Sequence, residues 1–354
     1  MFRIVLSTIM LAACLNLGLP VLSSTDDAVA ADFKGKTITM ILGTRPGGRR
    51  DRIARTIARH LAANLPGQPT ILVQNIPGGK GIPAQLKFSK SRPDGSVAGI
   101  VVSSDMEAPY FGAPGATYKP REYKWVGSVR TGKQRNVLFT TKKSGFKTID
   151  DLRSREVALG AQGVGHRSYL YGRLMAEVLG LKVRWVLGYS TPEMYLAMEK
   201  GEIDGRVNDS ASFKRDRPDW VEKQEVVAHV AMSLPENLPP IPGPLFAKTP
   251  ALITFTDKEI HKNLIRKMNA TSRLGGSVAL PPGTPESIRA AYEKALVTAG
   301  EDPKFKKDWE KFVGIRPYAG VADSAEVWEA VKIYTDWKPA IMKEFKRLGH
   351  QPPK

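Results

Sequence analysis

The sequence has almost no cysteine, because Cys14 is the only one in 354 residues. A chain with one cysteine cannot be a disulfide-stapled scaffold, so its fold must depend on packing. Long apolar runs are also missing beyond the N-terminus, which excludes a polytopic membrane protein. Hydrophobic residues still make up 42% of the chain, which is enough for real cores and too much for a disordered protein.

Acidic residues are few compared with basic ones. The chain has 35 Asp and Glu against 53 Lys and Arg, which gives a net charge of +18 at pH 7 and a pI near 9.8. Its length suits two domains of about 100–200 residues each. The positive charge of such a protein can serve nucleic acid, a membrane surface or a small anion.

The N-terminus has the features of a secretory signal peptide. Arg3 precedes an apolar run, and the small residues at 28–31 provide a cleavage site, so we predict a signal peptide over 1–30 and a periplasmic protein. Two alternatives stay open: an uncleaved membrane anchor, and lipid attachment at Cys14, which ends a lipobox-like Leu-Ala-Ala-Cys. Export disfavours nucleic acid as a partner.

Strands and helices alternate in two stretches of the chain. The first has expected strands at 36–42, 70–74 and 97–103, with helices at 49–65 and from 82 to 88. The second has expected strands at 136–141, 157–159, 183–187 and 203–207, with helices from 148, at 167–179 and at 192–200. This βαβ pattern predicts an α/β protein with largely parallel sheets.

The C-terminal part is expected to be mostly helical. Helices are predicted at 257–271, at 285–298 with Thr284 as the N-cap, at 303–312, and at 324–348 with a kink at Pro339. The proline-dense segment 238–245 is predicted to connect two domains.

Two glycine-rich loops, 43–51 and 75–83, each leave a strand and enter a helix. Such loops place backbone N–H groups and a positive helix end at the carboxyl edge of a sheet, where an anion can bind. Arg49 and Arg50 lie at a helix start, where cations are disfavoured by about 0.3–1 kcal/mol each. Either their side chains turn to water or to Asp51, or they help Arg45 hold an anion.

Nucleotide and catalytic motifs are incomplete. Gly43 and Gly48 have P-loop spacing, but two arginines follow where Lys and Ser or Thr are required. No histidine pair has the i, i+4 spacing of a zinc site, and no nucleophile elbow is found. His166 either donates to a ligand or caps a helix. The same two roles are open to the hydroxyls of residues 189–191 and to Asp209, which follows a strand.

Several motifs, taken in order, resemble the Bug-type receptors of tripartite tricarboxylate transporters. They are Arg45-Pro46-Gly47-Gly48 with Asp51, Ala54 and Arg55, then Val73-Gln74-Asn75-Ile76-Pro77-Gly78-Gly79, Pro93-Asp94-Gly95, Trp125-Val126-Gly127, Gly163-x-Gly165-His166, Gly188-Tyr189, Gly201-Glu202-Ile203-Asp204-Gly205 and Ala279-Leu280-Pro281-Pro282-Gly283-Thr284-Pro285. The sequence departs from the family pattern at Arg49, Arg50 and Lys80, which add positive charge.

The resemblance implies an α/β, two-lobed periplasmic-binding-protein architecture (type II-like), each lobe a mixed, mainly parallel sheet flanked by helices. Lobe one comprises 32–130 plus 242–354, and lobe two comprises 131–241. The resemblance implies that lobe closure binds a small carboxylate. The ligand-binding residues carried over are Thr44, Arg45, Gly47, Gly48, Arg49, Arg50, Asp51, Asn75, Pro77, Gly78 and Gly79 in lobe one, and Gln162, Gly163, Gly165, His166, Ser168, Tyr189, Ser190, Thr191, Asn208 and Asp209 in lobe two.

Three functional hypotheses follow. The first is a monomeric receptor that is not an enzyme, needs no cofactor, metal or nucleic acid, and passes its carboxylate to a membrane permease. The second is a basic envelope protein that binds anionic polymers or surfaces through one continuous Lys and Arg face. The third is an exported enzyme on the same fold, which requires His166 within hydrogen-bond reach of Ser168 or Ser190.

Overall fold

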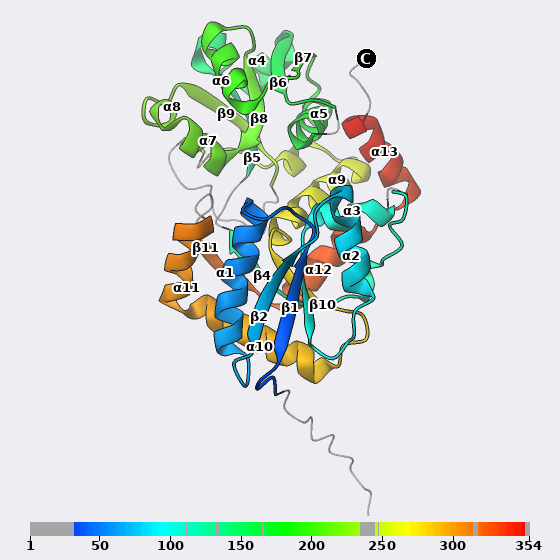
Figure 1. The fold of residues 1–354 in the computed structure, drawn as a ribbon. Coiled ribbons are helices and arrows are strands. Elements are labelled where there is room, and N and C mark those ends of the chain that lie inside the picture. The colour runs from blue at the N-terminus through cyan, green and yellow to red at the C-terminus, as the bar shows by residue number, and fades with distance from the viewer. Residues whose placement is uncertain are drawn as a thin grey trace, which may run out of the picture.

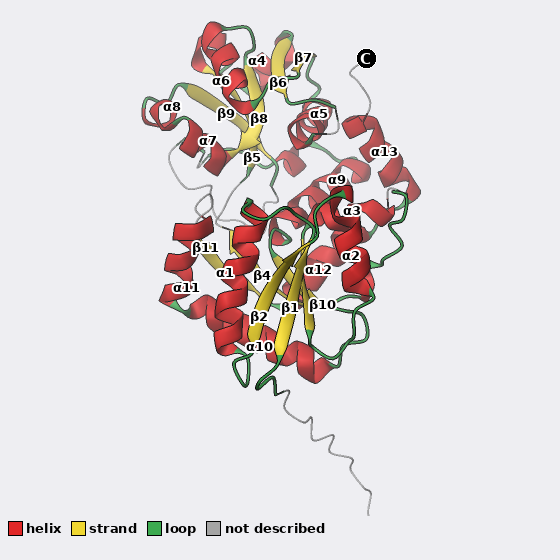
Figure 2. Ribbon diagram, viewed as in Figure 1, coloured by secondary structure: helices red, strands yellow, loops and turns green. Residues whose placement is uncertain are grey.

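A computed structural model describes residues 32–110, 112–131, 135–164, 166–233, 245–246, 248–313 and 318–350. The predicted signal peptide at 1–30, with Cys14, lies outside the described residues, as do Gly165 and most of the proline-dense segment 238–245. The chain forms two sheets, each covered by helices, which we call the first lobe and the second lobe (Figures 1 and 2).

The first lobe is built on a six-stranded sheet in the order β11-β4-β10-β3-β1-β2. Central β1 pairs with β2 and β3 in parallel, whereas β10 is antiparallel to both β3 and β4. The strand bounds are β1 Thr37–Leu42, β2 Thr70–Asn75, β3 Val97–Val101, β4 Lys124–Thr131, β10 Ser277–Leu280 and β11 Tyr318–Ala322.

Helices cover both faces of this sheet. One face packs on α1, α10 and α11 through residues such as Ile57, Leu296 and Phe305, and the other on α2, α3 and α12 through residues such as Phe88 and Val331. The bounds are α1 Arg49–Asn64, α2 Ile82–Ser89, α3 Ser103–Tyr110, α10 Glu286–Glu301, α11 Pro303–Asp308 and α12 Ser324–Thr335. The sheet is therefore buried on both sides, as the apolar strand 36–42 predicts.

The second lobe contains a five-stranded sheet in the order β7-β6-β8-β5-β9. β6 is parallel to β7 and β8, and β5 is antiparallel to β8 and β9. The strands are β5 Asn136–Thr141, β6 Val157–Ala161, β7 Val183–Leu187, β8 Gly205–Asp209 and β9 Val226–Ala231, and the helices are α4 Ile149–Ser154, α5 Arg167–Leu179, α6 Thr191–Lys200, α7 Ser210–Asp216 and α8 Pro218–Glu222.

The prediction of two lobes with mixed sheets is confirmed, but the parallel share is smaller than predicted. Among the described residues, two of the five strand pairs in the first sheet and two of the four in the second are parallel. Parallel pairing is confined to the strands that alternate with helices, because a parallel connection needs a crossover. The antiparallel strands β10 and β11 come from the region predicted to be mostly helical.

The long helix predicted at 324–348 is instead two helices. α12 ends at Thr335, and α13 spans Pro339–His350 with Pro339 as its first residue. A proline at the first helical position loses no hydrogen bond there, so it begins a new helix and does not kink an old one. The predicted cap at Thr284 is also displaced, because α10 is capped at Pro285 and the Thr284 hydroxyl donates to the Pro281 carbonyl.

Two helices from the C-terminal part pack on the second lobe. α9 (Glu259–Ala270) supplies Leu264, Ile265 and Met268, and α13 supplies Ile341, Phe345 and Leu348, to a core shared with α5 and the second sheet. Figure 1 shows both helices on one side of the molecule, beside α5. The predicted division at 242 remains a prediction, but the core of the second lobe includes residues that it assigned to lobe one.

No helix among the described residues has the length and apolar character needed to cross a bilayer.

We predict that the Leu348→Ala variant destabilises the protein by about 2–5 kcal/mol, because the side chain is fully buried in the second-lobe core. The matched control is Leu72→Ala, whose side chain is 56% exposed. Urea unfolding of both variants measures the difference. Equal losses of unfolding free energy would show that α13 adds nothing to this core.

Candidate functional site

The carboxyl ends of β1, β2 and β3 meet at one edge of the first sheet. Because these three strands are parallel, the loops that follow them lie side by side there. The first loop leads into α1, the second passes through a short 3-10 helix (Gly79–Gly81) into α2, and the third leads into α3. The predicted first-lobe residues therefore share one edge of the sheet.

The first two loops touch through their backbones. A Cβ atom on Gly43 would lie 2.6 Å from the Cα atom of Gly81. Gly81 itself has a φ of +87°, which side-chain-bearing residues rarely adopt. Glycine at both positions therefore allows an approach that no other residue permits.

Asp51 ties the two loops together. Its carboxylate accepts from the Gly47 backbone N–H at 2.9 Å, from Asn75 Nδ2 at 2.9 Å and from Arg55 Nε at 3.0 Å. Burial favours a raised pKa for Asp51, but these hydrogen bonds together lower the pKa below its ordinary value. Asp51 and Asn75, both predicted as ligand-binding residues, thus bond to each other.

The arginines at the start of α1 have different surroundings. Arg45 and Arg49 are exposed, whereas Arg50 turns to the third loop. There its guanidinium donates to Ser104 Oγ at 3.0 Å and lies 3.5 Å from Asp105 Oδ1. The partner of Arg50 is therefore Asp105, and Asp51 pairs with Arg55 instead.

Asp105 is a buried carboxyl that the sequence analysis did not identify. It is 2% exposed, and its Oδ2 accepts from the Val102 N–H at 3.2 Å. Burial raises its pKa to about 6, although Arg50 and the Val102 N–H act to lower it. Asp105 also lies against Gly81, where an added Cβ would be 3.0 Å from Oδ1, so it closes the space between the second and third loops.

In the second lobe, His166 caps α5. Its Nδ1 accepts from the Ser168 N–H at 3.1 Å and lies 2.9 Å from Ser168 Oγ. Loss of water around the ring, followed by the charges of Arg167 and Arg206, lowers the pKa of His166, so it is neutral at pH 7. A neutral ring with Nδ1 as the acceptor fits the capping role that the sequence left open.

The distance between His166 and Ser168 meets the requirement set for the enzyme hypothesis. However, the two residues are neighbours in one helix cap, and Nδ1 already accepts from a backbone amide. Ser168 Oγ in turn accepts from the Gln162 N–H at 3.3 Å. Local turn geometry therefore accounts for this contact without a catalytic role.

The other predicted second-lobe residues lie at the ends of β6, β7 and β8. Gln162 Nε2 is 3.5 Å from Thr191 Oγ1, which links two of the loops. The Ser190 N–H donates to Glu193 in a capping box, and Asp209 accepts from the Ser212 N–H at 3.0 Å. The remaining contacts are Tyr189 with Glu202 at 3.4 Å and Asn208 with the Tyr195 hydroxyl at 3.0 Å.

Arg167, which the sequence analysis did not select, connects the two lobes. It begins α5, and its Nη2 donates at 2.9 Å to Oγ1 of Thr271, which directly follows α9. Its guanidinium also interacts electrostatically with Tyr171, Tyr334 and Glu107, the last two from α12 and α3. The end of the 162–168 loop thus contacts the first lobe. A basic residue directly after His166 was the sequence signal available.

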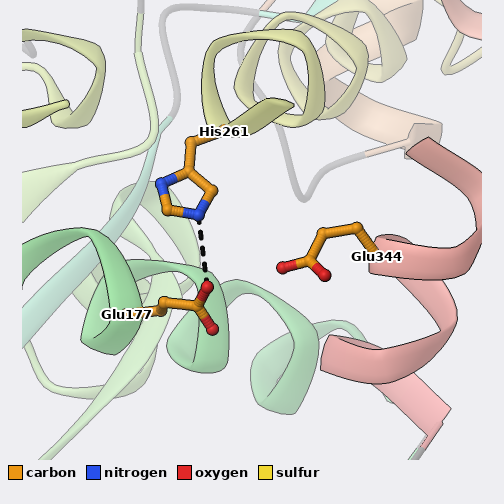
Figure 3. A group of neighbouring side chains, drawn as sticks. All are labelled: Glu177, His261 and Glu344. Atoms are coloured by element: carbon orange, nitrogen blue, oxygen red, sulfur yellow. Dashed lines mark hydrogen bonds and ion pairs between the residues drawn. The ribbon is translucent and has the colours of Figure 1, made fainter. Parts of the chain in front are cut away.

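One group of described side chains has the composition of a metal site. Glu177, His261 and Glu344 come from α5, α9 and α13, and their ligand atoms lie within 4.8 Å of one another (Figure 3). His261 is bonded to Glu177 at 3.2 Å, and Arg347 pairs with both carboxylates. Because the Arg347 guanidinium already pairs with both glutamates, the group is an ion-pair network that joins three helices.

No family model matches the chain. A protein of Agrobacterium vitis described as the UPF0065 protein in the TAR-I ttuE-ttuC' intergenic region is 24% identical over 284 residues, which cover 77% of this chain and 73% of the relative. A TctC solute binding protein from Polaromonas has a TM-score of 0.66 at 16% identity, covering 88% of this chain and 99% of that one. The periplasmic binding protein BugD has a TM-score of 0.50 at 18% identity, covering 90% and 99%.

These structures show that the chain has the two-lobed fold of periplasmic binding proteins. The predicted resemblance to TctC and Bug proteins is confirmed at the level of fold.

We predict that Gly43→Ala destabilises the protein by about 1–3 kcal/mol, because the new methyl group would collide with the backbone of Gly81. The control is Gly275→Ala, where an added Cβ has no atom within 4 Å and φ is not positive. Thermal unfolding compares the two. If both variants unfold at the same temperature, the contact between Gly43 and Gly81 is not tight.

We also predict that Asp105→Asn changes how stability depends on pH. The folded chain keeps a proton on Asp105 up to about pH 6, against an ordinary value of 3.8, so it binds more protons than the unfolded chain between these values. Lowering the pH through this window therefore stabilises the wild type, whereas asparagine cannot titrate. The variant should be more stable by about 2–3 kcal/mol at pH 7, and this advantage should disappear near pH 4.

Chemical denaturation at a series of pH values measures the effect. A constant stability difference between Asp105→Asn and wild type across that range would contradict the raised pKa.

Proposed function

We propose that the chain is an extracytoplasmic solute receptor of the Bug type, which binds a small carboxylate between its lobes and delivers it to a membrane permease. Its fold is that of a TctC solute binding protein and of the periplasmic binding protein BugD, and its sequence is similar to the UPF0065 protein of Agrobacterium vitis. The names of the first two describe binding proteins, and the name of the third gives only a family. None of the three names describes an enzyme.

The observation that carries the proposal is the open start of α1 at the edge of the first sheet. Gly48, its N-cap, has no side chain to accept hydrogen bonds from the first helical turn. The N–H groups of this first turn therefore have no side-chain acceptor from the N-cap residue. Together with the positive end of a 16-residue helix, they favour an anion. Asp51 does not fill this position, because its oxygens accept from Gly47, Arg55 and Asn75.

The loop geometry supports binding by backbone groups. The Gly43–Gly81 contact and the Asp51–Asn75 bond hold the two loops in a fixed relation, so the N–H groups do not have to be ordered when a ligand arrives. The residues proposed to face the carboxylate in the first lobe are Thr44, Gly47 and Gly48 with Pro77, Gly78 and Gly79. Arg45 and Arg49 are exposed beside them.

The second lobe is proposed to cover the ligand through Gln162, Ser168, Thr191 and neighbouring loop residues. Arg167 supports this arrangement, because at the start of α5 it interacts electrostatically with Tyr334 and Glu107 of the first lobe. Closure of two lobes over a ligand uses a hinge motion and excludes water from the ligand's polar groups.

The proposal includes a periplasmic, monomeric protein that needs no cofactor. Export follows from the signal-like segment 1–30, with lipid attachment at Cys14 as the alternative. The net charge of +18 favours rapid capture of small anions through long-range attraction.

Isothermal titration of refolded, ligand-free protein tests the proposal. Mono-, di- and tricarboxylates form the panel, and the corresponding amides are the controls. We expect at least one carboxylate to bind, and its amide to bind at least about tenfold more weakly, because charge-assisted hydrogen bonds contribute about 1.5–3 kcal/mol. If no carboxylate binds, the receptor function is wrong.

A further inference from the structure

The side of α1 that faces away from the core is a strip of arginines. The helix buries its apolar residues against the first sheet, and its basic residues repeat every three or four positions on the opposite side. They are Arg49, Arg52, Arg55 and Arg59. Arg55 and Arg59 are 49% and 53% exposed, and Asp51, the one acidic residue of this helix, is buried. The helix α1 therefore presents a line of positive charge to solvent.

A second basic strip lies beside the first. The helix α11 and the short helix η7 (Trp309–Val313), which follows it directly, pack against α1, and Figure 1 shows α11 next to α1. Lys304, Lys307 and Lys311 are exposed and lie three or four positions apart, on the side of Asp308. Asp308 pairs with Arg59 at 3.1 Å, so these lysines line the same surface as the arginines. We call the four arginines, these three lysines and Phe312 the α1–α11 face.

Phe312 is an exposed aromatic residue where the two strips meet. Its side chain is 38% exposed, which is unusual for a phenylalanine. The Arg59 guanidinium lies 5.1 Å from the centre of its ring, and the Lys311 ammonium lies 5.2 Å from it. The face therefore combines an apolar ring with cations on both sides of it. Such a ring can enter an apolar layer while the long basic side chains keep their charges at its polar boundary.

The charge of this region is large, and internal carboxylates neutralise only part of it. The helix α1 and residues 303–313 together contain nine Lys and Arg residues against three Asp and Glu residues, so 27 positions carry a third of the net charge of +18. Arg49 and Arg59 are ten positions apart, which is about 15 Å along a helix. Their side chains cannot converge on one small anion. An extended anionic surface, in contrast, attracts all of these cations at once.

We infer that the α1–α11 face binds the surface of an anionic phospholipid bilayer, with its lysines and arginines against the headgroups and Phe312 at the edge of the acyl chains. Clusters of four to eight Lys and Arg residues on a helical surface are attracted to anionic lipids. An aromatic side chain beside them adds an apolar anchor. The inference goes beyond the proposed receptor function, because it concerns where the protein rests and not what it carries.

Flotation of the exported protein with lipid vesicles tests the inference. One set of vesicles is pure phosphatidylcholine, and the other is an equal mixture of phosphatidylcholine and phosphatidylglycerol. The neutral vesicles control for insertion through the N-terminal apolar segment. We expect binding to the mixed vesicles to be at least about tenfold stronger, and to weaken steeply as the salt concentration rises, because salt screens exposed charges.

Two triple variants with the same loss of charge locate the binding surface. In the face variant glutamine replaces Lys304, Lys307 and Lys311, and binding to mixed vesicles should weaken by about 30- to 100-fold. In the control variant glutamine replaces three exposed lysines of the second lobe, and binding should stay near that of wild type. These are Lys182, Lys200 and Lys223. Phe312→Ala should weaken binding by about 3- to 10-fold and leave its salt dependence unchanged.

Several results would overturn the inference. Equal binding to neutral and mixed vesicles would exclude a role for charge, and equal losses in the two triple variants would exclude this face. Absence of binding to both kinds of vesicle would exclude a bilayer as the partner. If polyglutamate then bound to wild type and not to the face variant, the partner of the face would be an acidic protein. None of these results depends on a carboxylate ligand, so they leave the receptor function to its own test.

Discussion

The close contact between the first two loops of the first lobe is the constraint on which the candidate site depends. Gly43 and Gly81 allow the two backbones to touch, and Asp51 then bonds to both loops at once. A buried carboxylate with three donors is costly to leave unsatisfied, so the loops move together or not at all. The open start of α1 takes its position from this unit, and the parallel β1–β2 pair places it at the sheet edge.

The sequence was a good guide wherever a strand led into a helix. The strands expected at 36–42, 70–74 and 183–187 agree closely with β1, β2 and β7. It was a poor guide to β10 and β11, which have only four and five residues and lie between segments predicted to be helical. β10 pairs with β3 across more than 170 positions of the chain, and no local periodicity reports such a partner.

In the candidate site too, local patterns could be predicted from the sequence and long-range partners could not. The loops themselves, with their glycines and the capping residues His166 and Ser190, were found from local motifs. The partners of the charged side chains were not, because Arg50 meets Asp105 and Arg167 meets Thr271 only in the folded chain. Arg206 was predicted as one residue of a strand, and only the structure shows that it is a buried charge.

The positive charge at the start of α1 is therefore less available to a ligand than the sequence suggested, because part of it is paired within the protein. At the start of α1, Arg50 and Arg55 are engaged by internal aspartates, so neither offers a free guanidinium to a ligand. What remains at that edge is backbone N–H, which recognises a carboxylate by geometry, beside the exposed side chains of Arg45 and Arg49. If the proposed receptor binds its ligand this way, the first lobe holds a carboxylate without recognising the rest of the ligand. Discrimination between ligands then falls to the second lobe, where the start of α5 is already capped by His166.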